Sequence, residues 1–146
     1  MKIFLIKLVK FFICLTIITL LFATLTHYTI KSFSDFKLNE GEKNIILGHS
    51  HPEFGFDDSL IVNTRNLSSS GEAYFYTYYK LKQVYSQNKI KIVFIEFSNN
   101  VIEKKMDDWI FGYDKMNHFF YRHSPFMEKS DLIFLFKQNK KDFFRA

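Results

Sequence analysis

NIILGHSH (residues 44–51) and KIVFIEF (residues 91–97) are the two stretches of sequence that decide the fold. Each contains a compact apolar run that is followed by polar residues, which is typical of a buried parallel strand entering a loop. Residues 61–67 form a weaker third strand candidate. Between them, residues 71–88 carry apolar side chains at helical spacing, so the order strand, helix, strand predicts a parallel pair with a right-handed crossover.

The helix expected within residues 71–88 has plausible start signals. Ser70 or Gly71 is suited to cap its first turn, and Glu72 suits the positive end of the helix dipole. A last helix is expected from about Ser130 to Asn139. Trp109 and the other aromatic side chains between the two helices are interpreted as core.

The predicted fold class is α/β, with an open parallel sheet in a three-layer, flavodoxin-like arrangement. Residues 44–146 supply one domain of modest size, because about a hundred residues bury one core and not two. Three strands are fewer than a doubly wound sheet usually contains. We therefore expect the domain in this chain to be incomplete.

Residues 1–30 are interpreted as an N-terminal membrane anchor. The run from 11 to 30 contains no Asp, Glu, Lys or Arg, and its 20 residues would span the hydrocarbon core as a helix. We expect membrane lipid to surround this run. A cleavable signal peptide is the alternative, but the residues near Ala23 match a small-x-small cleavage site poorly.

The charges around the apolar run predict the orientation of the chain. Lys2, Lys7 and Lys10 precede it, so the N-terminus is expected in the cytoplasm. Residues 31–43 are interpreted as a polar tether, and the domain beyond them is expected in the periplasm or outside the cell. The net charge of +5 is scattered along the chain, which argues against a nucleic-acid interface. The single cysteine, Cys14, lies inside the anchor, so no disulfide can form within the chain.

Polar residues gather where the three expected strands end. The loops are Gly-His-Ser-His at 48–51, Ser-Ser-Ser-Gly at 68–71 and Ser-Asn-Asn at 98–100. The carboxyl ends of parallel strands lie side by side, and ligands bind at that edge of an open sheet. The sequence therefore predicts a functional site built from these three loops.

These blocks resemble, in their order and placement, the SGNH/GDSL superfamily of serine hydrolases and acyltransferases. The resemblance covers about residues 45–100 and implies that Ser50 is the catalytic nucleophile. It further implies an oxyanion hole formed by the backbone N–H groups of Ser50 and Gly71 and by the side-chain amide of Asn99. Such an enzyme needs no cofactor. Its expected substrates are acyl esters, or O-acyl groups on envelope polysaccharides.

The chain departs from the pattern of this superfamily in three places. His49 replaces the usual Asp of the first block, and Phe97 stands where the third block usually has Gly. The Asp-x-x-His pair that supplies the base is missing: the later histidines, His118 and His123, are preceded at the third position by Lys and Phe. The resemblance thus predicts an esterase or acyltransferase that is inactive unless a base comes from elsewhere.

Two other function classes remain open from the sequence. His49 and His51 form a His-x-His pair after a strand, which is a frequent metal-binding arrangement, so a metal-dependent hydrolase is the first alternative. A non-catalytic envelope domain that binds a glycan or a protein is the second.

Overall fold

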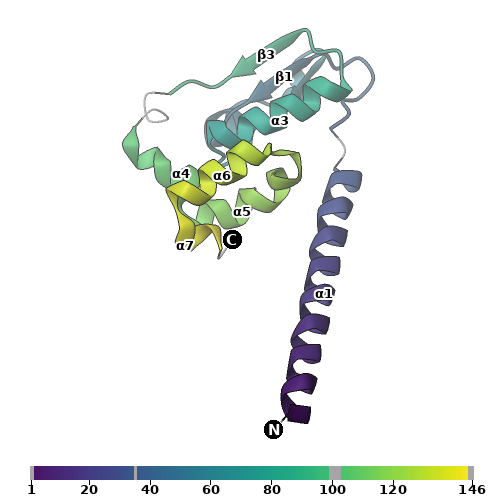
Figure 1. The fold of residues 1–146 in the computed structure, drawn as a ribbon. Coiled ribbons are helices and arrows are strands. Elements are labelled where there is room, and N and C mark those ends of the chain that lie inside the picture. The colour runs from purple at the N-terminus through teal and green to yellow at the C-terminus, as the bar shows by residue number, and fades with distance from the viewer. Residues whose placement is uncertain (1, 35, 99–102, 145–146) are drawn as a thin grey trace. The chain divides into compact units, whose positions relative to one another are not determined.

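The computed structural model describes residues 2–34, 36–98 and 103–144 of the chain. It shows a mixed α/β protein with a small open parallel sheet and one long apolar N-terminal helix (Figure 1). The chain divides into two compact units, residues 1–35 and residues 36–146, and each is described by itself.

The first unit is the helix α1, Lys2–Phe33, of 32 residues. At 1.5 Å per residue it is about 48 Å long, more than the roughly 30 Å of a hydrocarbon core. Thr16, Thr19 and Thr26 donate their hydroxyls to carbonyl oxygens one turn earlier, at 2.9 Å, so the helix satisfies these polar groups internally. Within the residues that the structure describes, α1 alone is long and apolar enough to cross a membrane.

The sheet of the second unit has three parallel strands in the order β2-β1-β3. Its strands are β1 Asn44–Leu47, β2 Thr64–Asn66 and β3 Ile92–Ile95. The central strand pairs Ile45 with Arg65 on one side and with Val93 on the other. The parallel sheet expected from the sequence is thus confirmed. β2 is shorter than predicted because Asn63 adopts a left-handed conformation (φ 56°) that precedes the strand.

Helix α3, Tyr74–Gln87, is the crossover between β2 and β3 and packs on one face of the sheet (Figure 1). Val84 is fully buried against Ile45 and Leu47 of the central strand. The helix begins later than predicted, with Ala73 as its N-cap. Gly71 has a left-handed backbone (φ +75°), so the chain turns there before the helix starts.

Glu72, expected at the positive end of the α3 dipole, is buried in the core. Its carboxylate lies 2.7 Å from Nζ of Lys80 and accepts the hydroxyl of Thr77 at 3.0 Å. Burial raises the pKa of Glu72, while the Lys80 charge opposes that rise. The buried His123 ring lies 3.9 Å away, and burial lowers its pKa to about 4, so His123 is neutral at pH 7. Lys80 therefore neutralises Glu72.

The opposite face of the sheet is more open. Ile46 of β1 lines an apolar pocket of about 140 Å³ together with Phe56, Ile61, Thr64 and Phe94. Phe94 keeps 51% of its surface exposed. Among the described residues, α3 forms a helical layer on one face of the sheet. A second helical layer on the opposite face, which would complete the expected three-layer fold, stays a prediction.

Short helices complete the second unit. They are α2 Ser50–Gly55, η1 Asp58–Leu60, η3 Lys104–Met106, α4 Asp107–Phe111, α5 Tyr113–His123, η4 Ser124–Phe126, α6 Lys129–Gln138 and α7 Lys140–Phe143. The predicted last helix corresponds to α6, which Glu128 caps in a capping box with Asp131. A second core forms where Phe119 of α5 packs on Ala73 and Tyr76, with Trp109 partly buried against it.

Residues 36–43, which lie within the stretch 31–43 expected to be a polar tether, belong to the second unit. Phe36 and Leu38 pack against the core under β1. Asn88 fixes the segment, because its side chain accepts the Leu38 N–H at 2.8 Å and donates to the Phe36 carbonyl at 2.7 Å. The apolar side chains at these two positions explain the docking.

Candidate functional site

The loops that follow β1 and β2 meet at one edge of the sheet, whereas residues 99 and 100 of the third expected loop lie outside the described residues. The N–H of Ser69 donates to the Gly48 carbonyl at 3.0 Å, which joins the loops after β2 and β1. The N–H of Ser70 donates to the Glu53 carboxylate of α2 at 2.7 Å, and the Ser70 hydroxyl also contacts that carboxylate. Glu53 therefore ties α2, which follows the first loop, to the loop after β2.

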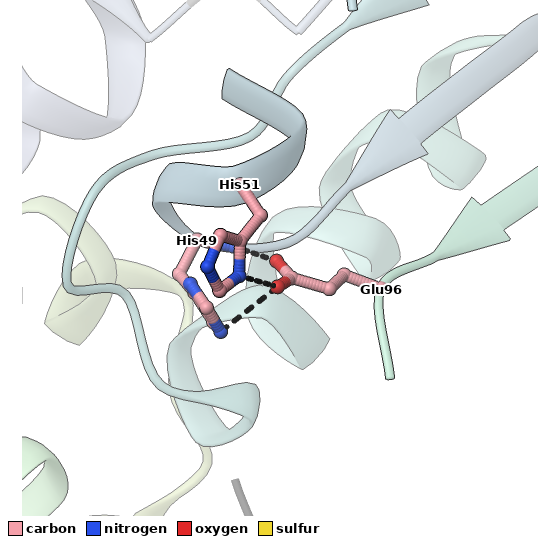
Figure 2. A group of neighbouring side chains, drawn as sticks. All are labelled: His49, His51 and Glu96. Carbon is pink, nitrogen blue, oxygen red and sulfur yellow. Dashed lines mark hydrogen bonds and ion pairs between the residues drawn. The ribbon is translucent and has the colours of Figure 1, made fainter. Parts of the chain in front are cut away.

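Two histidines from the first loop meet Glu96, which directly follows β3. Nε2 of His49 lies 3.0 Å from Oε1 of Glu96, and Nδ1 of His51 lies 2.8 Å from the same oxygen. The backbone N–H of His49 donates to Oε2 at 2.9 Å. Figure 2 shows both imidazole rings directed at the one carboxylate. We refer to His49, His51 and Glu96 as the His–His–Glu cluster.

The His–His–Glu cluster has a buried side and an open side. The side chain of His49 is 9% exposed and that of Glu96 is 10% exposed, whereas the side chain of His51 is 72% exposed. A small ion or molecule can therefore reach the cluster from the His51 side. The protein surrounds its other side.

Gly48 allows the carboxylate to approach the first loop so closely. A Cβ at this position would lie 2.6 Å from Cβ and Oε2 of Glu96 and 2.6 Å from Cγ of Pro52. These distances are too short for any side chain, so only glycine leaves room for Glu96 beside the backbone of the loop.

Two aromatic residues, Tyr74 and Trp109, contact members of the His–His–Glu cluster. Tyr74, the first residue of α3, donates its hydroxyl to the backbone carbonyl of Glu96. Burial and the Glu96 charge raise the pKa of Tyr74, so the hydroxyl stays a donor at neutral pH. Trp109 of α4 packs edge-on against the His49 ring, with 5.9 Å between ring centroids. Trp109, interpreted as core from the sequence, thus contacts both the core and the cluster.

Ser50, the predicted nucleophile, is the first residue of α2. Its hydroxyl oxygen lies 3.4 Å from Nδ1 of His49, which is the outer limit of a hydrogen bond. Because Nε2 of His49 contacts Glu96, the order of groups is hydroxyl, imidazole, carboxylate. The sequence considerations did not identify His49 as a base for Ser50.

The two other residues expected in the oxyanion hole have different outcomes. Gly71 lies in the loop that the hydrogen bonds of Ser69 and Ser70 place at this edge, and its positive φ fits a tight turn. The ammonium of Lys115 lies against it. Asn99 lies outside the described residues. The hydroxyl of its neighbour Ser98 is buried and has no hydrogen-bond partner among the described atoms.

Glu96 is the site residue that the sequence considerations missed. It follows the most apolar strand of the chain, and it was counted as part of that strand. A carboxylate at the end of a buried run, level with the polar block after the neighbouring strand, is the signal that points to it. The later histidines lie elsewhere: His123 is buried beside Glu72, and His118 contacts the ring of Phe119 on α5.

The ligand set of the cluster suits a divalent transition metal. Two imidazoles and one carboxylate are found in catalytic zinc sites and in non-haem iron sites. The nitrogen and oxygen atoms that would bind the ion all lie within 4.8 Å of one another. Ligand atoms around tetrahedral zinc are about 3.4 Å apart, given bonds of about 2.1 Å. An ion would therefore need the 2.8 and 3.0 Å contacts to open by about half an ångström, and the two imidazole nitrogens, which lie within 4.8 Å of one another, to take the same spacing of about 3.4 Å.

Comparison of the chain with protein-family models, with curated proteins and with solved structures found no match.

Proposed function

We propose that this chain is a membrane-anchored, exported hydrolase whose His–His–Glu cluster binds zinc or a similar divalent metal. The observation that carries the proposal is the shared carboxylate oxygen, which lies 3.0 Å from the His49 ring and 2.8 Å from the His51 ring. Three protein ligands leave the fourth position of a tetrahedral ion free, which is the arrangement of catalytic rather than structural zinc.

The residues of the chain have separate roles in this proposal. A bound zinc ion would lower the pKa of a water molecule to about 7 and so supply a nucleophile for ester hydrolysis. Glu96 holds both imidazoles in place and is itself fixed by the His49 N–H. The hydroxyl of Ser50, 3.4 Å from Nδ1 of His49, orients the ring from behind, as an outer hydrogen-bond partner does for a metal ligand.

The proposed location follows from α1 and its flanking charges. The lysines at 2, 7 and 10 favour a cytoplasmic N-terminus, so the cluster would face the periplasm or the cell exterior. Esters of envelope components are then the substrates that the site can reach. Both this orientation and the substrate class are part of the proposal.

Zinc binding is the first prediction. The full-length chain in detergent is expected to bind one zinc ion, and His49→Ala and His51→Ala should each abolish that binding because each removes one of three ligands. His118→Ala is the matched control, since His118 is an exposed histidine outside the cluster and its loss should leave zinc binding unchanged. Competition with a chromophoric chelator measures the affinity. Equal zinc binding by all four proteins would contradict the proposal.

A second candidate function uses Ser50 as a nucleophile. It is supported by the row Ser50, His49, Glu96, with contacts of 3.4 and 3.0 Å, in which His49 would accept the serine proton and Glu96 would stabilise the imidazolium. The resemblance to SGNH hydrolases and acyltransferases leads to the same nucleophile, acting on acyl esters or polysaccharide O-acyl groups. The 3.4 Å contact joins neighbouring residues and is long, so we rank this candidate second.

Covalent labelling distinguishes the two candidates. A serine hydrolase is expected to react with a fluorophosphonate in the presence of a chelator, and Ser50→Ala should abolish the labelling. Ser86→Ala, an exposed serine on α3, should not change it. If the wild-type chain stays unlabelled while it binds zinc, the serine candidate is wrong.

A further inference from the structure

Lys115 reaches from α5 to the edge of the sheet where the His–His–Glu cluster lies. Its Nζ lies 4.9 Å from the centre of the Trp109 ring, and that ring packs against His49 with 5.9 Å between centroids. The two contacts together put the ammonium within about 11 Å of the centre of the His49 ring. The flexible stem of a lysine can shorten this distance further.

Gly71 leaves room for this ammonium. A Cβ on Gly71 would lie 2.1 Å from Nζ of Lys115 and 3.2 Å from Cε, so any side chain would occupy the place of the charge. Gly71 belongs to the loop that Ser69 and Ser70 bind to the first loop of the site. The ammonium is thus seated between the second loop of the site and the indole ring.

Lys115 differs from Lys80 and Lys82 in its electrostatic partners. Lys80 pairs with Glu72 at 2.7 Å, and Lys82 pairs with Glu128 at 2.8 Å. Lys115, which is half-buried, makes no ion pair with any residue in the described part of the chain. The Lys115 ammonium contacts the Trp109 ring and lies against Gly71, but it is not neutralised by a carboxylate. It can therefore form a charge-assisted hydrogen bond with an anion that enters the site.

We propose that Lys115 is a specificity-determining residue that binds an anionic group of the substrate, and that the substrate class is a phosphate ester. This inference rests on the proposed metal site: phosphoryl oxygens would bind the metal on one side and the Lys115 ammonium on the other. A neutral acyl ester offers no anionic oxygen to Lys115 in its ground state. The seated charge therefore favours phosphate esters over neutral esters.

Inorganic phosphate is the ligand for the test, used with the full-length chain in detergent after zinc loading. Lys115→Gln is expected to weaken phosphate binding about tenfold or more, because a charge-assisted hydrogen bond is lost, while zinc affinity stays unchanged. Lys82→Gln is the matched control, since Lys82 also lies over aromatic rings and should not affect phosphate binding. Equal phosphate affinity of the wild type and Lys115→Gln would overturn the proposal.

Gly71→Ala provides a second variant that keeps the lysine. The methyl group would displace Nζ, the far end of a flexible side chain, and would strain the left-handed backbone at this position (φ +75°), so phosphate binding should weaken although the charge remains. Circular dichroism checks that both variants are folded.

A chain that binds no zinc would overturn the proposed function, and phosphate titration of the metal-free protein would then test Lys115 alone. Tighter binding of phosphate by the wild type than by Lys115→Gln would support the role of Lys115 in anion binding. Equal affinities would overturn it.

Discussion

Replacing Glu96 with Gln is expected to lower the zinc affinity of the chain at least about 100-fold, because loss of even an outer partner of a metal ligand costs about 10- to 100-fold. The variant keeps the shape of the side chain and removes its charge. Both imidazoles contact the carboxylate oxygen that would be lost as an anionic ligand. Competition titration against a chromophoric chelator gives the affinity ratio.

The control for this prediction is another glutamate at the same edge of the sheet. Glu53→Gln should leave zinc affinity unchanged, because Glu53 binds the Ser70 N–H and is not part of the cluster. Glu96→Gln retains a carbonyl oxygen that can accept the His49 N–H, so its free energy of unfolding should fall by only about 1 kcal/mol. A folded Glu96→Gln protein that binds zinc as tightly as the wild type would exclude Glu96 as a ligand.

The parts of the fold that could be predicted are those with a continuous apolar pattern. β1, Asn44–Leu47, coincides with the apolar run before Gly48. Ile45 and Leu47 of this run have no exposed surface, so burial explains its apolar pattern. The crossover helix α3 was predictable from its spacing, but its start was not. Gly71 adopts a left-handed turn, and the buried Glu72 pairs with Lys80 through a tertiary contact that residue patterns do not contain.

The candidate site was predictable as a place and only partly as a set of residues. Parallel strands bring their carboxyl ends together, so the loop with His49, Ser50 and His51 could be assigned to the edge of the sheet. Trp109 and Lys115 reach the same edge from α4 and α5, about 60 residues further along the chain. Such long-range approaches leave no trace in local periodicity.

The segment after α1 shows the same limit. Residues 36–43 are polar enough to look like a tether, yet Phe36 and Leu38 are sufficient to dock them under β1. Their backbone is bound by Asn88, which lies 50 residues away from Leu38. A segment whose composition is typical of a linker can thus be part of the folded unit when two of its side chains pack against the core.

The buried pair of Glu72 and Lys80 is expected to have the largest effect on stability. Glu72→Ala should lower the free energy of unfolding by about 3 to 5 kcal/mol, because Lys80 would remain as a largely buried charge without a carboxylate, held only by the Leu67 carbonyl at 2.7 Å. The two side chains are 2% and 14% exposed. His123, the other nearby titratable group, is neutral at pH 7 and carries no negative charge in either protonation state, so it cannot replace the lost carboxylate. Urea unfolding of the full-length chain, followed by circular dichroism, measures the change.

A double-mutant cycle isolates the pair from simple loss of packing. Lys80→Met in the Glu72→Ala background should restore much of the stability, since it removes the unpaired charge and adds apolar volume. Glu128→Gln breaks the exposed pair with Lys82 and should cost no more than about 1 kcal/mol. If Glu72→Ala costs as little as Glu128→Gln, the pair does not hold the core.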